Sequence, residues 1–397
     1  MTTTINNEHK KLNVPNLRFK EFQGEWEKCK LGDACNVFMC KRILASQTNT
    51  EGGVPFYKIG TIGSAPDAYI SKELFDDYKA KYNYPHKGEV MITCAGTVGK
   101  CVTYDGKDAY YQDSNIVWID NPSQHISNGF LYHLLANVDW RKLNSTTIIR
   151  IYNDDLRNLK LSYPQIEEQK KISRLLFLLD ERIATQSKII EDLKKLKSAI
   201  IEEHYKNAEK QSVLVSDLGE PFNVGNLSKE DLTTTGTPCV LYGELFTTYE
   251  AAINHVESHT NKSDGMTLSK KGDLLFPSST TVDAVSLIAP SAINVDGVIL
   301  GGDMFGIHIN SDFNAQYLSY FFNHIAKSQF AKYAKGSTII HLHYKDIAKA
   351  KLSLSCLEEQ NRMAKCLMSL DDKIAIESTL SDLLNSQKVY LLCQMFI

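Results

Sequence analysis

The stretch STTIIRIY at residues 145–152 recurs as GSTIIHLH at residues 336–343, which lies 191 residues further along the chain. At the same offset, IEEQ at 166–169 is matched by LEEQ at 357–360. A repeat of this period is the signature of a duplicated structural unit. The sequence therefore predicts two modules that share one scaffold.

The repeat extends on both sides of these stretches. LDERI at 179–183 is matched by LDDKI at 370–374, again 191 residues later. Upstream, KGEVMI at 87–92 corresponds to KGDLLF at 271–276, with an offset of 184. The scaffold segments agree while the loops between them do not. This pattern indicates two modules that share a fold but recognise different things.

Each module begins with short segments of strand character. They are rich in Val, Ile, Tyr and Phe and are punctuated by Gly, Pro, Asn and Asp, which favour turns. A helix is expected to follow these strands in each module. The expected strands include 54–59, 89–93, 115–119 and 273–277, and the expected helices are 128–136 and 314–327.

Each repeat closes with a long helix. No Pro or Gly interrupts residues 165 to 218, and a helix of roughly 40 residues spans about 60 Å. Apolar residues at steps of three and four form matching seams, which favour antiparallel packing of the two helices as a coiled coil. The alternative is that each helix packs only on its own module. The seam residues are Ile172, Leu176, Leu179 and Ile183 in the first helix, and Met363, Leu367, Leu370 and Ile374 in the second.

These patterns predict an α+β fold. It consists of two pseudo-symmetric domains, each a mixed β-sheet with small helices, separated by two long antiparallel coiled-coil helices. The expected boundaries are 1–165 for the first domain, 166–210 for the helical spacer, 211–356 for the second domain and 357–397 for the last helix.

The charge of the chain argues against an autonomous nucleic-acid binder. The formal net charge is −3; residues 15–166 carry 18 Lys and Arg against 17 Asp and Glu, and residues 211–357 carry 10 against 14. Tight binding to DNA needs an excess of Lys and Arg to neutralise phosphates. If this chain binds DNA, we expect other subunits to supply much of the electrostatic attraction.

The chain shows no targeting or redox signal. Residues 1–12 are polar and no run of about 18 apolar residues occurs, so we expect neither a signal peptide nor a membrane span. The default expectation is a cytoplasmic protein. The nine cysteines include no Cys-x-x-Cys pair, and we expect reduced thiols rather than a zinc site.

Several motifs, taken in order, resemble a known family. They are the helix entries YPQIEEQ at 163–169 and SCLEEQ at 355–360, the turn CAGTVGK at 94–100, and the opening PNLRF at 15–19 followed by Trp26. With the duplicated helices, this set is similar to the specificity subunits of type I restriction-modification systems, and the resemblance covers nearly the whole chain. The second module departs from the pattern, because it has STTVD at 279–283 instead of the glycine turn and lacks the proline of the first helix entry.

The resemblance implies that this chain itself catalyses no reaction. Each module would be a target-recognition domain that reads one half of a split, asymmetric site in double-stranded DNA, and the length of the helices would set the gap between the halves. The helices, with the seam residues named above, would bind two methyltransferase subunits, and two motor-nuclease subunits would complete the complex. The partners, and not this chain, would use S-adenosylmethionine, ATP and magnesium.

No catalytic or metal-binding motif stands against this interpretation. NPSQ at 121–124 lacks the second proline and the aromatic residue of an adenine-methyltransferase motif, and 96–100 lacks the first glycine and the Ser or Thr of a P-loop. His341 and His343 share one face of a strand but have no third ligand nearby, so we expect no metal. The alternative function is a two-module scaffold that binds protein partners; an enzyme of unrecognised fold is the least favoured.

Polar residues on loops beside the repeated scaffold are the candidates for reading DNA. Scaffold fixes the position of such loops, and their side chains can bond to base edges or phosphates. In the first module they are Lys41, Arg42, Lys58, Thr61, Thr93, Gly96, Thr97, Lys100, Arg150, Tyr152 and Asn153. In the second module they are Tyr242, Ser278, Ser279, Thr280, Ser337, His341, His343 and Tyr344.

Overall fold

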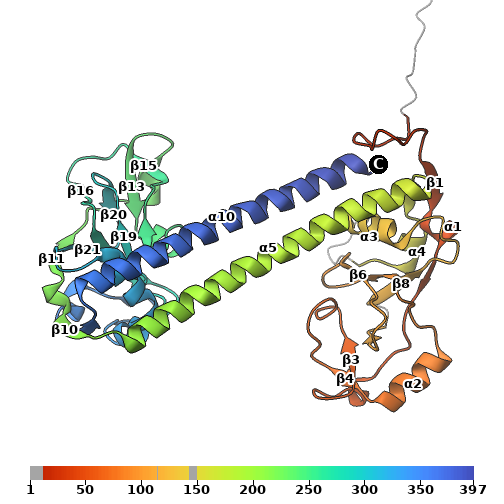
Figure 1. Ribbon diagram of the computed structural model, residues 1–397, viewed down its shortest axis with the longest axis horizontal. Helices are drawn as coiled ribbons and strands as arrows, with labels where there is room; N and C mark the ends of the chain where they lie inside the picture. Colours follow the sequence, from red (N-terminus) through yellow and green to blue (C-terminus); the bar gives the residue numbers. More distant parts are fainter. Residues whose placement is uncertain (1–11, 114, 143–149) are drawn as a thin grey trace, which may run out of the picture. The chain divides into compact units, whose positions relative to one another are not determined.

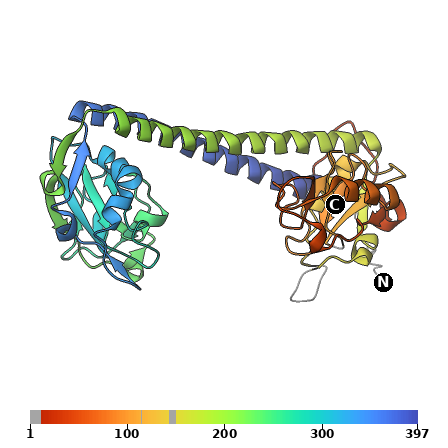
Figure 2. The same cartoon turned by 90° about the horizontal axis from the view of Figure 1, so that it is seen from below.

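The computed structural model of the protein describes residues 12–113, 115–142 and 150–397. The chain divides into two compact units, one formed by Met1–Gln186 with Leu380–Ile397 and the other by Ser187–Thr379. Both long helices, α5 (Ile166–Asn207) and α10 (Leu357–Met395), contribute to both units (Figure 1 and Figure 2). No helix in the described parts of the chain is long and apolar enough to cross a membrane.

The first unit consists of small sheets covered by short helices. Its elements before α5 are β1 (Glu27–Lys30), α1 (Leu31–Ala34), β2 (Asn36–Phe38), η1 (Ala45–Gln47), β3 (Val54–Tyr57), β4 (Tyr69–Ile70), α2 (Lys72–Lys81), β5 (Val90–Thr93), β6 (Cys101–Thr103), β7 (Tyr110–Tyr111), β8 (Ile116–Asp120), α3 (Asn128–Ala136), α4 (Asn153–Arg157) and β9 (Lys160–Tyr163). An antiparallel sheet has the order β2-β8-β5-β6, and a second has the order β4-β3-β7, in which β3 and β7 are parallel. β1 pairs with β9.

The second unit repeats this plan with longer sheets. Its elements between α5 and α10 are β10 (Gln211–Leu214), η2 (Val215–Asp217), β11 (Gly219–Asn223), η3 (Lys229–Asp231), β12 (Leu232–Thr233), β13 (Thr237–Leu241), α6 (Glu244–Thr247), β14 (Ala252–Ile253), β15 (Ser258–Thr260), β16 (Thr267–Leu268), β17 (Asp273–Pro277), β18 (Ser279–Thr280), β19 (Ser291–Ile293), β20 (Ile299–Gly301), β21 (Met304–Ile309), α7 (Ala315–Tyr320), the π-helix η4 (Phe321–Ile325), α8 (Lys327–Ala331), β22 (Ile340–His341), α9 (Tyr344–Ile347) and β23 (Lys351–Leu354). The sheet orders are β11-β21-β17-β19-β14 and β12-β15-β13-β20-β16.

The strand pairings establish the duplication. β1 with β9 corresponds to β10 with β23, and β2-β8-β5-β6 corresponds to β11-β21-β17-β19. The parallel pair β3 and β7 corresponds to the parallel pair β13 and β20. The predicted α+β fold, with two mixed β regions and two long helices packed together, is confirmed. The domain boundaries given above stay predictions.

A buried glutamine explains why Glu-Glu-Gln is repeated at the start of each long helix. The Gln169 side chain is fully buried; its Oε1 accepts from the backbone N–H of Ser127, which caps α3, at 2.7 Å. Its Nε2 donates to the carbonyls of His125 and Pro164, both at 2.8 Å. Each glutamine therefore ties its long helix to the first turn of a short helix. In the second unit, Gln360 accepts from the N–H of Asn314, the cap of α7, and donates to the carbonyl of Ser355.

Replacing Gln169 with alanine is expected to lower the free energy of unfolding by about 2 kcal/mol, because the change leaves buried backbone groups without a partner. Chemical denaturation of the full chain measures this loss. Gln165→Ala is the matched control, because Gln165 is exposed one turn earlier and its replacement should leave stability almost unchanged. Equal effects of the two substitutions would contradict the assigned role of Gln169.

The repeated Leu-Asp segments pair the two long helices within each unit. In the first unit, Asp180 of α5 forms an ion pair of 2.5 Å with Lys388 of α10. In the second unit, Asp371 of α10 forms an ion pair with Lys197 of α5, and its other oxygen accepts from Tyr320 at 2.6 Å. Both the aspartates and the lysines are 191 residues apart. The repeat thus includes the cross-helix pairs as well as the sheets.

The predicted seam residues serve the cores of the units as well as the helix pair. Ile172 and Leu176 are almost fully buried in the first core, beside Met395 at the end of α10. Leu367 is buried in the second core. The remaining seam residues are half-buried; they are Leu179, Ile183, Met363, Leu370 and Ile374. Each long helix therefore packs on its own module and also against the other long helix.

Candidate nucleic-acid interface

A glycine turn at the end of β5 forms the centre of the predicted reading surface in the first module. The Thr93 hydroxyl is buried, donates to the carbonyl of Thr97 and accepts from the N–H of Lys100 at 3.0 Å. Gly96 and Gly99 have φ of +65° and +84°, in the region that favours glycine. Thr93 therefore holds the turn from inside, while Gly96 and Thr97 are exposed on it.

The loop after β3 packs against this turn. The Lys100 ammonium donates to the carbonyl of Ile62 at 2.5 Å, and the Thr97 hydroxyl donates to the carbonyl of Ile59 at 3.4 Å. The predicted residues Lys58 and Thr61 belong to the same loop, where the Thr61 hydroxyl accepts from the Lys58 N–H at 3.0 Å. The Lys58 ammonium forms an ion pair with Asp67 at 2.9 Å. Both lysines are thus partly engaged within the module.

The segment after residue 149 completes this surface. The backbone of Ile151 donates to the carbonyl of Cys94 at 2.9 Å, which places Arg150 and Tyr152 beside the glycine turn. The Arg150 guanidinium lies 5.9 Å from the centre of the Tyr152 ring, and the Tyr152 side chain is exposed. Burial raises the pKa of the Cys94 thiol to about 12, while the Arg150 charge acts in the opposite direction. Asn153 is half-buried at the start of α4.

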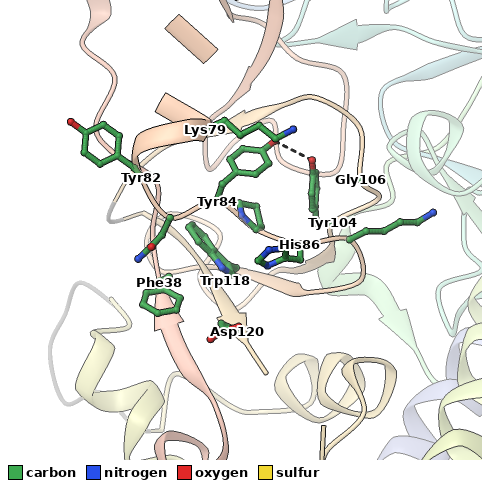
Figure 3. A pocket seen from close by; sticks show the side chains of 12 residues that line it. Phe38, Lys79, Tyr82, Tyr84, His86, Tyr104, Gly106, Trp118 and Asp120 are labelled. Atoms are coloured by element: carbon green, nitrogen blue, oxygen red, sulfur yellow. Dashed lines mark hydrogen bonds between the residues drawn. The ribbon is translucent and has the colours of Figure 1, made fainter. Parts of the chain in front are cut away.

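Lys41 and Arg42 are exposed, and no described contact joins their side chains to the glycine turn. The Lys41 ammonium instead lies 5.3 Å from the centre of the Tyr82 ring. Tyr82 borders an aromatic groove of about 610 Å³ that the sequence did not reveal. Figure 3 shows its lining, which includes Phe38, Tyr84, Tyr104 and Trp118.

The aromatic groove lies at the opposite end of β8 from the glycine turn. Asp120 at the groove ends β8, whereas Ile116 at the start of β8 pairs with Thr93. Inside the groove, the hydroxyls of Tyr84 and Tyr104 are 3.0 Å apart (Figure 3). Burial, together with the hydrogen bond to Tyr104, raises the pKa of the Tyr84 hydroxyl above its ordinary value. The first module therefore carries two separate surface features.

The second module builds the corresponding surface from paired short strands. Ser279 pairs with His341, and Thr280 pairs with Ile340, where β18 meets β22. Ser278 and Ser279 are buried, whereas Thr280 and His341 are half-buried. The adjoining cleft has a volume of about 1120 Å³. Predicted residues that line it are Tyr242, Ser279 and Thr280, and other lining residues are Phe246, Asp303 and Ile339.

The remaining predicted residues of the second module lie outside this cleft. Ser337 is exposed on the turn before β22. His343 and Tyr344 line a different groove beside β11, together with Phe222. The rings of His341 and His343 are 6.2 Å apart and nearly parallel. Within the described residues, no three His, Cys, Asp or Glu side chains gather as a metal site.

Sequence reasoning missed two residues that the fold places beside these surfaces. Asn115 lies where β8 begins, and its carbonyl accepts from Cys94 N–H at 2.8 Å. Asp303 lies where β21 begins, and its carbonyl accepts from Ser278 N–H at 2.7 Å. The two are 188 residues apart, which matches neither of the offsets seen in the sequence. Each residue directly precedes a buried strand, and this position is the sequence signal that could have identified it as a candidate.

The comparison with protein families decides the identity of the chain. The family described as the type I restriction modification DNA specificity domain matches residues 23–195 and again 209–386. The chain belongs to this family of type I specificity subunits. Membership makes it the DNA specificity subunit of a type I restriction-modification system rather than a catalytic subunit. This decides against the scaffold alternative.

Individual relatives agree with the family assignment. A putative type I restriction enzyme specificity subunit of Haemophilus influenzae is 51% identical over 147 residues, which are 37% of this chain and 38% of that protein. The putative MjaX specificity subunit of Methanocaldococcus jannaschii is 24% identical across 93% of this chain and 92% of its own length. The type I S subunit structure from M. genitalium has a TM-score of 0.65 at 15% identity, and it covers 97% of this chain and 99% of its own. That likeness shows a shared fold.

A second solved structure shares the fold as well. It comes from work on complex assembly and conformational transition of the type I restriction-modification system. Its TM-score is 0.52 at 14% identity, and it covers 92% of this specificity subunit and 96% of its own chain.

Proposed function

We propose that each module of this specificity subunit is a target-recognition domain that reads one half of a split, asymmetric site in double-stranded DNA. The observation that carries the proposal is a backbone hydrogen-bond frame that occurs in both modules. Cys94 bonds through its N–H to the Asn115 carbonyl and through its carbonyl to the Ile151 N–H. Ser278 bonds in the same way to Asp303 and Leu342. The two modules display different side chains on this frame. A shared frame gives both modules the same way of presenting loops. Different side chains on those loops give them different bases to recognise.

The two long helices are the proposed docking surface for two methyltransferase subunits. Ile172, Leu176 and Leu367 are buried within their units and would act by holding the helices in place. Apolar residues on the outward faces of the helices are available for direct contact. They are Leu178, Ile189 and Leu196 of α5, and Ile376, Leu383, Val389 and Tyr390 of α10.

The partners are proposed to supply the chemistry and much of the affinity. Methyltransferase subunits would use S-adenosylmethionine, and two motor-nuclease subunits would use ATP and magnesium. The modules carry net charges close to zero or negative, so phosphate contacts would come largely from partner lysines and arginines. The assembled complex would act in the cytoplasm, where its DNA lies.

Co-expression with the methyltransferase subunit of the same system tests this function. Sequencing that detects methylated bases should find methylation at one split, asymmetric motif, and only when this chain is present. Methylation at the same motif without this chain would refute the proposed role.

Replacing Arg150 with alanine is expected to weaken recognition of one half-site by about 1 to 3 kcal/mol of binding free energy, as for loss of a base contact. Competition binding with DNA altered in one half at a time measures the effect. Arg157→Ala removes the same charge from a residue that packs beside Gly32 and should leave both half-sites unchanged. Equal loss at both halves would show that the modules are not independent readers.

A further inference from the structure

The glycine turn of the first module is held against the start of β8 by a short backbone frame. Cys94 N–H donates to the carbonyl of Asn115 at 2.8 Å, and the Cys94 carbonyl accepts from Ile151 N–H at 2.9 Å. Cys94 is buried, whereas Asn115 is half-buried. The frame therefore fixes the backbone of Asn115 beside the predicted reading residues.

The second module contains the same frame. Ser278 N–H donates to the carbonyl of Asp303 at 2.7 Å, and the Ser278 carbonyl accepts from Leu342 N–H at 2.9 Å. Ser278 follows Cys94 by 184 residues and Leu342 follows Ile151 by 191, the two offsets of the sequence repeat. Asp303 is thus the structural counterpart of Asn115. The duplication retains the frame and exchanges an amide for a carboxylate.

Both side chains are available to a ligand. Asp303 is exposed and lines the cleft that also contains Tyr242, Ser279 and Thr280. Among the described residues, none forms a hydrogen bond with the Asn115 amide or the Asp303 carboxylate. The backbone that carries each side chain is held in place where two strands meet. A backbone held in this way is a rigid support for a specific contact.

We propose that Asn115 and Asp303 are equivalent base-reading positions, at which Asn115 recognises adenine and Asp303 accepts a hydrogen bond from the amino group of cytosine. This proposal rests on the proposed function of the two modules. Asparagine can bond in a bidentate way to N6 and N7 of adenine, and aspartate accepts from N4 of cytosine in the major groove. A carboxylate facing DNA is repelled by phosphates, so it needs such a donor to be tolerated.

The composition of the second module supports the assignment to Asp303. No arginine occurs between Arg182 and Arg362. The commonest specific contact in protein–DNA complexes, arginine to guanine, is therefore absent from this module. Its reading must rely on lysine, histidine, hydroxyl, amide and carboxylate groups. Two acids, Glu244 and Asp303, line the cleft together with the predicted hydroxyls. The Glu244 carboxylate accepts from the Leu241 N–H and the Ser258 hydroxyl, whereas no described residue forms a hydrogen bond with the Asp303 carboxylate.

The test is the methylation motif of the complete complex carrying Asp303→Asn or Asn115→Asp. Asp303→Asn should change the preferred base at one position in one half-site from cytosine towards adenine, with discrimination altered about tenfold or more. Asn115→Asp should produce the reverse change in the other half-site. Asp312→Asn is the matched control, because Asp312 is an exposed acid outside the cleft, and it should leave the motif unchanged.

The outcomes separate this inference from the function on which it rests. A wild-type complex without a split motif would refute the proposed function itself. A split motif in the wild type that neither substitution alters would overturn this inference alone. Equal loss of methylation at every sequence, with the complex still assembled, would also overturn it, because the side chains would then act without base preference. If one variant fails to assemble, the other still decides the question.

Discussion

Replacing Arg18 with alanine is expected to lower the free energy of unfolding by about 4 kcal/mol, because it leaves a buried carboxylate without its partner. The Arg18 guanidinium donates to both oxygens of Glu168, at 2.8 and 2.7 Å, and the Glu168 side chain is fully buried. Arg18 also donates to the carbonyls of Gly24 and Gln23. One side chain therefore joins the opening segment to the first turn of α5.

Denaturant unfolding of the full chain measures this loss. Arg18→Lys should recover only part of the stability, because an ammonium cannot reproduce the two-pronged contact with the carboxylate. Arg362→Ala provides the control: Arg362 pairs with Glu359 in the corresponding part of α10, but its side chain is mostly exposed. That pair should contribute less than about 1 kcal/mol. Similar losses for Arg18→Ala and Arg362→Ala would contradict this account.

Replacing Gly99 with alanine is expected to abolish reading by the first module while the second continues to read its half-site. Gly99 has a positive φ, and an added Cβ would overlap the ring of Trp140, which is buried. Backbone strain and overpacking each cost on the order of 1 to 3 kcal/mol, so the turn must move or the local structure must loosen. Either outcome displaces Gly96 and Thr97 from their places beside Arg150.

Half-site binding assays with the assembled complex measure this effect. Gly52→Ala is the control, since Gly52 also has a positive φ but an added Cβ would meet nothing within 4 Å. It should cost only about 1 kcal/mol and leave recognition intact. Normal reading of both halves by the Gly99→Ala complex would show that the turn is not part of the interface.

Local patterns in the sequence were sufficient to predict most of the scaffold. The strand 273–277 and the helix 128–136 occur with the predicted bounds, because strand pattern and capping are local signals. The single helix predicted over 314–327 is wrong: α7 gives way to a π-helix at Phe321 and then to α8. Phe321 and Phe322 in the π-helix are both buried, as are Tyr317 to Tyr320 in the regular helix α7. No Pro or Gly in 314–327 marks the wider turn, so no local signal in the sequence predicts it.

The candidate interface was less accessible to sequence reasoning. Thr93, Thr97 and Lys100 could be grouped because they are close in sequence. The sequence did not show that Thr93 is used inside the turn, or that the Lys41 side chain lies over Tyr82. Asn115 and Asp303 come into place through strand pairing across loops of unequal length, which no constant offset reveals. Of the repeated stretch at 145–152, residues 145–149 lie outside the described residues.

Exchange of one module tests the central claim most directly. Residues 211–356 would be replaced by the second module of another type I specificity subunit, and the methylation motif of the complex would be determined by sequencing. This account predicts that one half of the motif changes and the other half is retained. A motif that stays the same, or one that changes in both halves, would contradict the claim that this chain reads DNA through two independent modules.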